Sequence, residues 1–161
     1  MTKRKICAVV TARPSYSRVK TALLAIKEHP KLELQLVVAG SALLDRYGNT
    51  IDFIEKDGFT ISEKVFMVLE GENKTAMAKT TGLGVMELAN VFYNLQPDAV
   101  ITIADRFETI ATSIAAAIEG KCRSCSHHAT KCRPTITPRS GTSTAKPTAR
   151  TTLAITRTIF E

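Results

Sequence analysis

The stretch CAVVTARPSYSRVKTALLAI, residues 7–26, sets the pattern on which this chain folds. It opens within an apolar run, residues 5–12, that is rich in β-branched side chains and typical of a strand buried on both faces. Apolar residues then recur at helical spacing over residues 14–29, and this pattern stops before Pro30. A buried strand followed directly by a helix predicts the first step of a strand–helix–strand unit.

The same alternation of strand and helix continues to about residue 118. Strands are predicted near residues 5–12, 33–39, 64–69 and 98–104. Helices are predicted over residues 14–29, 51–57, 73–95 and 107–118, and Gly82 and Gly84 inside the third of these indicate close packing. We therefore expect an α/β fold, in which a Rossmann-like parallel sheet carries helices on both faces.

Charge is distributed unevenly along the chain. Residues 1–120 carry 14 basic and 14 acidic side chains, whereas residues 121–161 carry eight basic side chains and one acidic one. The net charge of +7 therefore comes from the C-terminal segment, and we expect no nucleic-acid partner for the α/β part. No apolar stretch approaches the roughly 18 residues that span a bilayer, and the apolar run after MTKRK is too short for a secretory signal. We expect a cytoplasmic protein with no membrane partner.

The loop between the first strand and the first helix is a candidate anion site. In parallel sheets, ligands bind beyond the carboxyl ends of the strands, where loops lead into helix N-termini. The loop has no G-x-G-x-x-G, so the dinucleotide fingerprint is absent. Instead, the Arg13 guanidinium, the hydroxyls of Ser15 and Ser17, and the backbone N–H groups that follow Pro14 suit a pyrophosphate. The alternative is a surface arginine beside a serine cap.

A second candidate loop, IADRFET at residues 103–109, places Asp105 and Arg106 between the fourth strand and its helix. A carboxylate at this edge of a sheet can act as an acid or base, and the neighbouring arginine can hold a phosphate. The alternative is that Asp105 caps the helix and Arg106 belongs to a neighbouring ion pair.

Four long segments of this chain resemble successive parts of the hydrolysing UDP-N-acetylglucosamine 2-epimerases, the branch that supplies N-acetylmannosamine for sialic-acid-type sugars. They are TARPSYSRVK, GSALLDRYGNTIDFIEKDGF, VLEGENKTAMAKTTGLG and LQPDAVITIADRFETIATSIAAA. The resemblance runs in order from about residue 4 to residue 118. Because several long segments agree, it is more specific than a single short motif.

The resemblance implies the N-terminal half of a two-domain fold like that of GT-B glycosyltransferases, with a UDP-sugar between two Rossmann-like halves. The family eliminates UDP across C1 and C2 of the sugar to give a glycal, and then adds water to release N-acetylmannosamine. The resemblance implies that no cofactor and no metal are needed. It also implies that the full-length proteins form homo-oligomers. By the same resemblance, Arg13, Ser17 and Arg106 contact the UDP moiety, and Asp105 is the candidate catalytic acid or base.

The resemblance ends near residue 120, where the family continues with further catalytic residues and a second domain. We therefore expect two parts, a truncated N-terminal domain over residues 1–120 and a basic, Thr/Pro/Cys-rich tail over residues 121–161 that is disordered or read out of frame. One chain of this kind is expected to be inactive by itself.

Two other functions stay open. The first is that the half-domain serves as an oligomerisation or regulatory partner. The second is a zinc or nucleic-acid module in the tail, with ligands drawn from Cys122, Cys125, His127 or His128, and Cys132.

Overall fold

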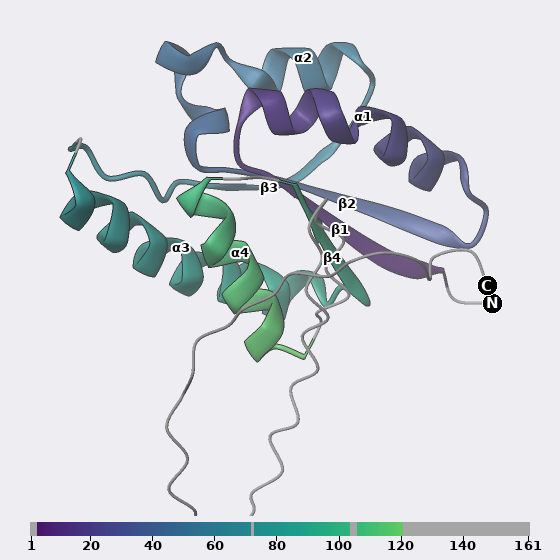
Figure 1. The fold of residues 1–161 in the computed structure, drawn as a ribbon. Coiled ribbons are helices and arrows are strands. Elements are labelled where there is room, and N and C mark those ends of the chain that lie inside the picture. Colours follow the sequence, from purple (N-terminus) through teal and green to yellow (C-terminus); the bar gives the residue numbers. More distant parts are fainter. Residues whose placement is uncertain (1–2, 72, 104–105, 121–161) are drawn as a thin grey trace, which may run out of the picture.

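The computed structural model describes residues 3–71, 73–103 and 106–120, which form a parallel sheet between two layers of helices (Figure 1). The strands are β1 (Arg4–Val10), β2 (Leu32–Ala39), β3 (Ile61–Val65) and β4 (Ala99–Thr102). The α-helices are α1 (Arg13–Glu28), α2 (Thr50–Lys56), α3 (Lys74–Leu95) and α4 (Phe107–Ile118). Two short 3₁₀ helices, η1 (Gly40–Leu43) and η2 (Asp45–Tyr47), connect β2 to α2. The predicted α/β fold with a parallel sheet is confirmed.

The strand order is β3-β2-β1-β4, so the chain builds the sheet outward from β1 in both directions. On one side β1 pairs with β2, with Val10 opposite Val38, and on the other it pairs with β4, with Val9 opposite Thr102. The Asp98 carboxylate accepts a hydrogen bond of 2.8 Å from the backbone N–H of Lys5, which joins the starts of β1 and β4. Strands β2 and β3 are added on one side of β1 and β4 on the other, so the direction in which strands are added changes between β1 and β4. Such a change leaves a crevice at the carboxyl ends of the strands.

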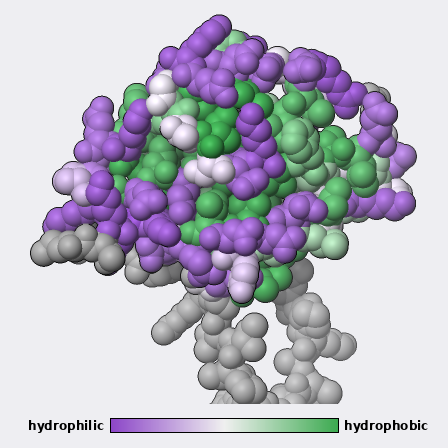
Figure 2. Space-filling model, turned by 180° about the vertical axis from the view of Figure 1, so that it is seen from behind, coloured by the Kyte–Doolittle hydropathy of each residue, from purple (hydrophilic) through white to green (hydrophobic). Residues whose placement is uncertain are grey.

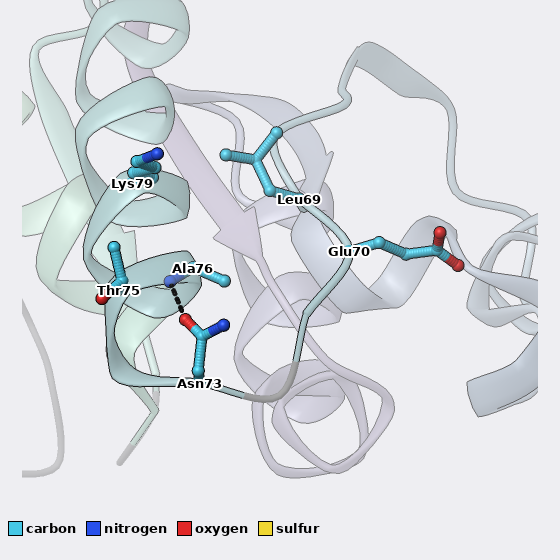
Figure 3. A pocket seen from close by; sticks show the side chains of 6 residues that line it. All are labelled: Leu69, Glu70, Asn73, Thr75, Ala76 and Lys79. Atoms are coloured by element: carbon cyan, nitrogen blue, oxygen red, sulfur yellow. Dashed lines mark hydrogen bonds between the residues drawn. The ribbon is translucent and has the colours of Figure 1, made fainter.

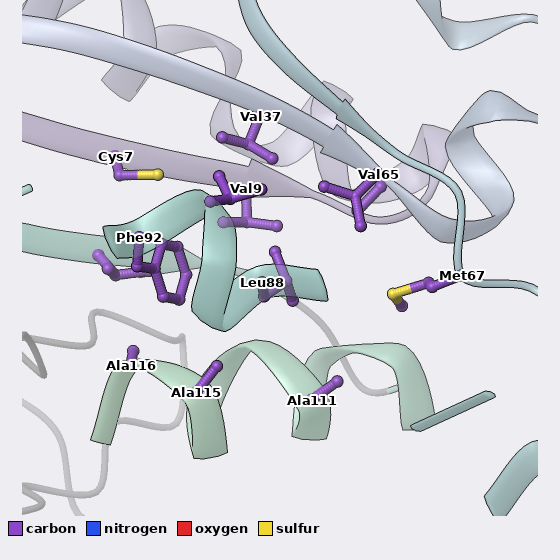
Figure 4. Packing of buried hydrophobic residues seen from close by; sticks show 13 residues of the cluster. Cys7, Val9, Val37, Val65, Met67, Leu88, Phe92, Ala111, Ala115 and Ala116 are labelled. Atoms are coloured by element: carbon purple, nitrogen blue, oxygen red, sulfur yellow. The ribbon is translucent and has the colours of Figure 1, made fainter. Parts of the chain in front are cut away.

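Successive side chains of each central strand enter different cores. On β1, Ala8 and Val10 face α1 and α2, where they pack with Leu23 and Ile54. The alternate residues of β1, among them Val9, face α3 and α4 (Figure 4). Burial on both faces explains why this strand has a continuous apolar run rather than an alternating one.

Cys7 lies in the core between the sheet and the α3–α4 layer and is fully buried. Burial raises the pKa of the Cys7 thiol to about 12, because the charged thiolate would lose its hydration. Cys7 is therefore a neutral core side chain rather than a nucleophile.

Helices α3 and α4 pack closely because small residues line their contact. A Cβ placed on Gly84 would lie 2.9 Å from the Cβ of Ala111 and 2.6 Å from the sulfur of Met67. Ala115 and Ala116 of α4 are buried against the same cluster (Figure 4). Close packing was the expected reason for a glycine in this helix, and Gly84 confirms it. For Gly82 the expectation of close packing is wrong, because no atom lies within 4 Å of a Cβ placed there.

The prediction for the third strand was wrong in its bounds, because β3 spans Ile61–Val65 rather than residues 64–69. Residue Val65 pairs with Ala39, the last residue of β2, so the ladder has no partner residues beyond it. The apolar alternation nevertheless continues past the strand, since Phe66 is 73% exposed and Met67 is 1% exposed. The predicted strand followed this alternation, which continues beyond the residues that pair with β2. The sequence pattern does not show where the neighbouring strand ends.

The surface of the described residues carries large apolar side chains. Seen from behind, hydrophobic residues gather over the middle of the molecule with hydrophilic residues around them (Figure 2). Within residues 3–71, 73–103 and 106–120, no helix combines the length and the apolar character needed to cross a bilayer. The expectations for residues 121–161, including the tail and the cysteines and histidines that could bind zinc, lie outside the described residues.

Candidate functional site

Arg13 and Arg106 lie at equivalent positions beyond the ends of the neighbouring strands β1 and β4. Val9 of β1 lies opposite Thr102 of β4, and Arg13 and Arg106 each come four residues later. Because the two strands are parallel, both arginines lie at the carboxyl edge of the sheet. The loop after β1 leads to α1 on one face and the loop after β4 leads to α4 on the other (Figure 1). The crevice between such diverging loops is where ligands bind in open α/β sheets.

The Arg13 side chain is held by contacts with two other segments. Its guanidinium carbon lies 4.5 Å from the centroid of the Phe53 ring, within the range of a cation–π contact. A Cβ on Gly48, whose φ is +76°, would lie only 2.9 Å from Arg13 Nη1. Arg13 therefore crosses from the start of α1 to the segment between β2 and α2. A cation–π contact restrains the guanidinium through its carbon and uses none of its N–H groups as hydrogen-bond donors.

The start of α1 offers fewer backbone donors than predicted. The helix begins at Arg13 rather than at Pro14, and Pro14 has no N–H. The N–H of Ser15 donates to the carbonyl of Ala12 at 3.1 Å, so it is engaged within the turn. Ser15 is also buried, whereas Ser17 is exposed. Of the polar groups predicted in this loop, the side chains of Arg13 and Ser17 are the ones open to a ligand.

At the end of β4, Arg106 occupies the N-cap position of α4. Its Nε donates to Oε2 of Glu108 at 3.1 Å, and the two side chains differ greatly in exposure, with 43% for Arg106 and 1% for Glu108. Asp105 lies outside the described residues, so its catalytic role and the alternative in which it caps this helix both stay predictions.

Polar and small residues join the strand ends beneath these arginines. The carbonyl of Thr11 accepts hydrogen bonds from the Ser41 hydroxyl at 2.8 Å and from the N–H of Ala42 at 3.0 Å. A Cβ on Gly40, whose φ is +62°, would lie 3.4 Å from Cγ of Glu108. The loops after β1 and β2 and the first turn of α4 therefore meet at one point.

Sequence reasoning missed Glu108, Ser41 and Gly48 as parts of this edge. Glu108 stands inside the quoted segment IADRFET, two residues after Arg106, and an acid in the first turn of a predicted helix was a usable signal. Nothing in the local pattern around Ser41 or Gly48 reveals that they meet the loop after β1.

A separate open depression of about 370 Å³ lies where the chain enters α3 (Figure 3). Asn73 caps this helix, because its side-chain oxygen accepts from the N–H of Ala76 at 2.7 Å. The depression is lined by Leu69, Glu70, Asn73, Thr75, Ala76 and Lys79. It contains neither arginine of the predicted site. Among residues 3–71, 73–103 and 106–120, no three His, Cys, Asp or Glu side chains are grouped as a metal site.

The known proteins that this chain resembles include several named as 2-epimerases of nucleotide sugars. Residues 24–121 match the family described as UDP-N-acetylglucosamine 2-epimerase. A Campylobacter jejuni protein named GDP/UDP-N,N'-diacetylbacillosamine 2-epimerase (hydrolyzing) is 30% identical over 113 residues, which are 70% of this chain and 29% of that protein. A Legionella pneumophila protein named UDP-N,N'-diacetylbacillosamine 2-epimerase (hydrolyzing) is 32% identical over 70% of this chain and 30% of its own length. The chain thus spans about 30% of the length of the curated relatives it matches.

Solved structures agree on the fold. A crystal structure of a UDP-N-acetylglucosamine 2-epimerase matches 80% of this chain and 33% of its own, with a TM-score of 0.67 and 19% identity. The Neisseria meningitidis UDP-GlcNAc 2-epimerase, whose structure is bound to UDP-GlcNAc, matches 78% of this chain and 32% of its own, with a TM-score of 0.64 and 16% identity.

Proposed function

Because this chain belongs to the UDP-N-acetylglucosamine 2-epimerase family, we propose that its described residues form the UDP-binding side of a hydrolysing 2-epimerase. The observation that carries the proposal is the placement of Arg13 and Arg106 at the ends of β1 and β4, four residues beyond paired positions. Two arginines in the loops that follow adjacent strands suit the two phosphates of UDP, because each guanidinium can make parallel charge-assisted hydrogen bonds. The hydroxyl of Ser17, exposed on the first turns of α1, is the third proposed contact.

The proposed reaction removes UDP from UDP-N-acetylglucosamine across C1 and C2 and then adds water to give N-acetylmannosamine. Negative charge builds on the departing UDP in the first step, and preplaced arginines stabilise such charge as it develops. Arg13 and Arg106 would act in this way, with Asp105 as the acid or base that the sequence predicts. Two relatives carry the word hydrolyzing in their names, which supports this branch of the family.

The sugar of the substrate is open to test, since those two relatives are named for diacetylbacillosamine rather than N-acetylglucosamine. Because the chain spans about 30% of their length, we expect groups outside that span to be needed for turnover. We therefore propose nucleotide binding without turnover for the 161-residue chain by itself.

Binding is best tested by titrating the 161-residue chain with UDP and with uridine, and following backbone amide shifts by NMR. We expect UDP to bind and uridine to bind at least roughly tenfold more weakly, because uridine lacks the charged phosphates. Arg13→Ala and Arg106→Ala should each weaken UDP about tenfold, the order expected for a lost charge-assisted hydrogen bond. Arg18→Ala is the matched control, because Arg18 is an exposed arginine of the same helix, α1. Equal affinity for UDP and uridine would contradict the proposal.

A further inference from the structure

Glu108 is a buried carboxylate whose place the proposed function does not explain. Its side chain is 1% exposed at the start of α4, where most acids would reach solvent. Taking a carboxylate out of water is costly unless a partner compensates it. Among the described residues, the hydrogen-bond partner of this carboxylate is Arg106.

The hydrogen bond between Arg106 and Glu108 is made by the Nε of the guanidinium group. Glu108 Oε2 accepts from Nε, the nitrogen nearest the arginine backbone, at 3.1 Å. A guanidinium has five N–H donors, and one of them lies on Nε. The four donors on the two Nη atoms therefore remain at the outer end of a side chain that is 43% exposed. They are well placed to meet an anion from the solvent side.

Glu108 itself is held in position. Its Cγ lies 3.4 Å from the point where a Cβ of Gly40 would stand, so its stem packs against the loop after β2. The residue reaches from the first turn of α4 to the point where the loops after β1 and β2 meet. A carboxylate packed in this way can set the direction of a flexible arginine.

We propose that Glu108 is a positioning residue, which grips Arg106 by Nε so that its Nη atoms face the pyrophosphate at the carboxyl edge of the sheet. This inference rests on the proposed function, since it assumes that Arg106 binds UDP. Glu108 acts through Arg106 and does not touch the nucleotide. Its effect on binding should therefore depend on whether Arg106 is present.

A double-mutant cycle tests this dependence with UDP as the probe. Glu108→Leu keeps an apolar side chain of similar size in the buried site and removes the acceptor. We expect it to weaken UDP roughly fivefold to tenfold in the wild-type background and less than about twofold in Arg106→Ala. Glu108→Gln keeps an acceptor oxygen and should recover most of the affinity that Glu108→Leu loses. Thr109→Val, the neighbouring buried position, is the control for packing at the start of α4.

Two outcomes would overturn the inference and leave the proposed function standing. One is an equal loss of UDP affinity from Glu108→Leu in both backgrounds, which would mean a purely structural role. The other is an unchanged affinity in Glu108→Leu while Arg106→Ala weakens binding. Absence of UDP binding in the wild-type chain would instead contradict the proposed function.

The side-chain Nε–H signal of Arg106 reports the contact without any nucleotide. In NMR spectra of the free chain, we expect this proton to exchange slowly with water in the wild type and in Glu108→Gln. It should exchange rapidly in Glu108→Leu. A slowly exchanging signal in Glu108→Leu would contradict the proposed grip even if UDP failed to bind.

Discussion

At the scale of single residues, Gly48 shows how a loop can control an arginine from another element. Its φ of +76° is strained for any residue with a Cβ, and that Cβ would lie 2.9 Å from Arg13 Nη1. Gly48→Ala should lower the free energy of unfolding by about 1–3 kcal/mol and, by displacing Arg13, weaken UDP binding. Thermal unfolding and NMR titration measure the two effects separately.

Gly58→Ala is the matched control for this experiment. Gly58 has a similar φ of +75°, and the nearest neighbour of a Cβ placed there would be Lys27 Nζ at 3.9 Å. It should share the loss of stability and keep the affinity for UDP. An equal loss of affinity in both variants would show that Gly48 acts through general stability and not through Arg13.

Asp57 links α1 to the end of α2 and makes stability depend on acid pH. Its carboxylate accepts hydrogen bonds from Lys20 Nζ at 2.7 Å and from the Tyr16 hydroxyl at 2.6 Å. These bonds, that from Lys20 first, hold the pKa of Asp57 below its usual value. A depressed carboxyl pKa stabilises the fold above the unfolded pKa of about 4, and that stabilisation is lost as pH falls through the folded pKa.

Asp57→Asn should therefore flatten the acid side of the stability profile. We expect the variant to be less stable than the wild type at pH 7 and to lose less stability between about pH 5 and about pH 2.5. Urea unfolding at a series of pH values measures this difference. Asp45→Asn, which removes an exposed carboxylate, is the control and should follow the wild-type profile. A parallel decline in Asp57→Asn and the wild type would contradict the assignment.

At the scale of elements, the contact between α3 and α4 depends on one glycine of two. Gly84→Ala would force a Cβ to within 2.6 Å of the Met67 sulfur and 2.9 Å of Ala111. We expect this overpacking to cost about 1–3 kcal/mol, more than the helix propensity that alanine adds. Chemical denaturation with a far-UV signal gives the change in unfolding free energy.

Gly82→Ala, in the same helix, is expected to stabilise the protein, whereas Gly84→Ala is expected to destabilise it. No atom lies within 4 Å of a Cβ placed there, so alanine should stabilise α3 by about 0.5–1 kcal/mol. If the two substitutions shifted stability in the same direction, the helix contact at Gly84 would not be as close as described.

At the scale of the whole molecule, α4 is apolar on both of its faces. Ala111 and Ala115 are buried against α3, while Ile110, Ile114 and Ile118 form an exposed stripe at 53%, 41% and 73%. A helix that is hydrophobic all round is typical of a fully buried environment, and its outer stripe here faces solvent. Exposed apolar stripes of this kind lower solubility.

Ile118→Lys should raise the solubility limit of the chain. Because Ile118 is 73% exposed, the unfolding free energy should change by less than about 0.5 kcal/mol. Asn90→Lys adds the same charge at an exposed position of α3 and removes no large apolar group. Turbidity at rising protein concentration compares the variants, and an equal gain from Asn90→Lys would assign the effect to net charge alone.

The sequence predicted which loops carry the arginines of the candidate site. The strand-to-helix breaks predicted that Arg13 and Arg106 follow β1 and β4, and the structure places both at the carboxyl edge. Their role in binding UDP, with Ser17 and Asp105, stays a prediction. Glu108 was missed because a glutamate in a predicted helix is usually an exposed charge. Its neighbour at the site, Gly40, lies far away in sequence.

The apolar pattern along the chain was enough to predict the class of fold, because the period of apolar residues reflects which faces of each element are buried. The sequence by itself also determined the resemblance to one enzyme family, because long segments agree in order. The pairing of β4 with β1, the contact of Arg13 with the Phe53 ring and the ion pair between Arg106 and Glu108 became visible in the folded chain alone. Local periodicity indicates that a residue is buried, but it does not indicate which residue it packs against. Strand pairing and side-chain contacts between distant segments depend on how whole elements pack against one another.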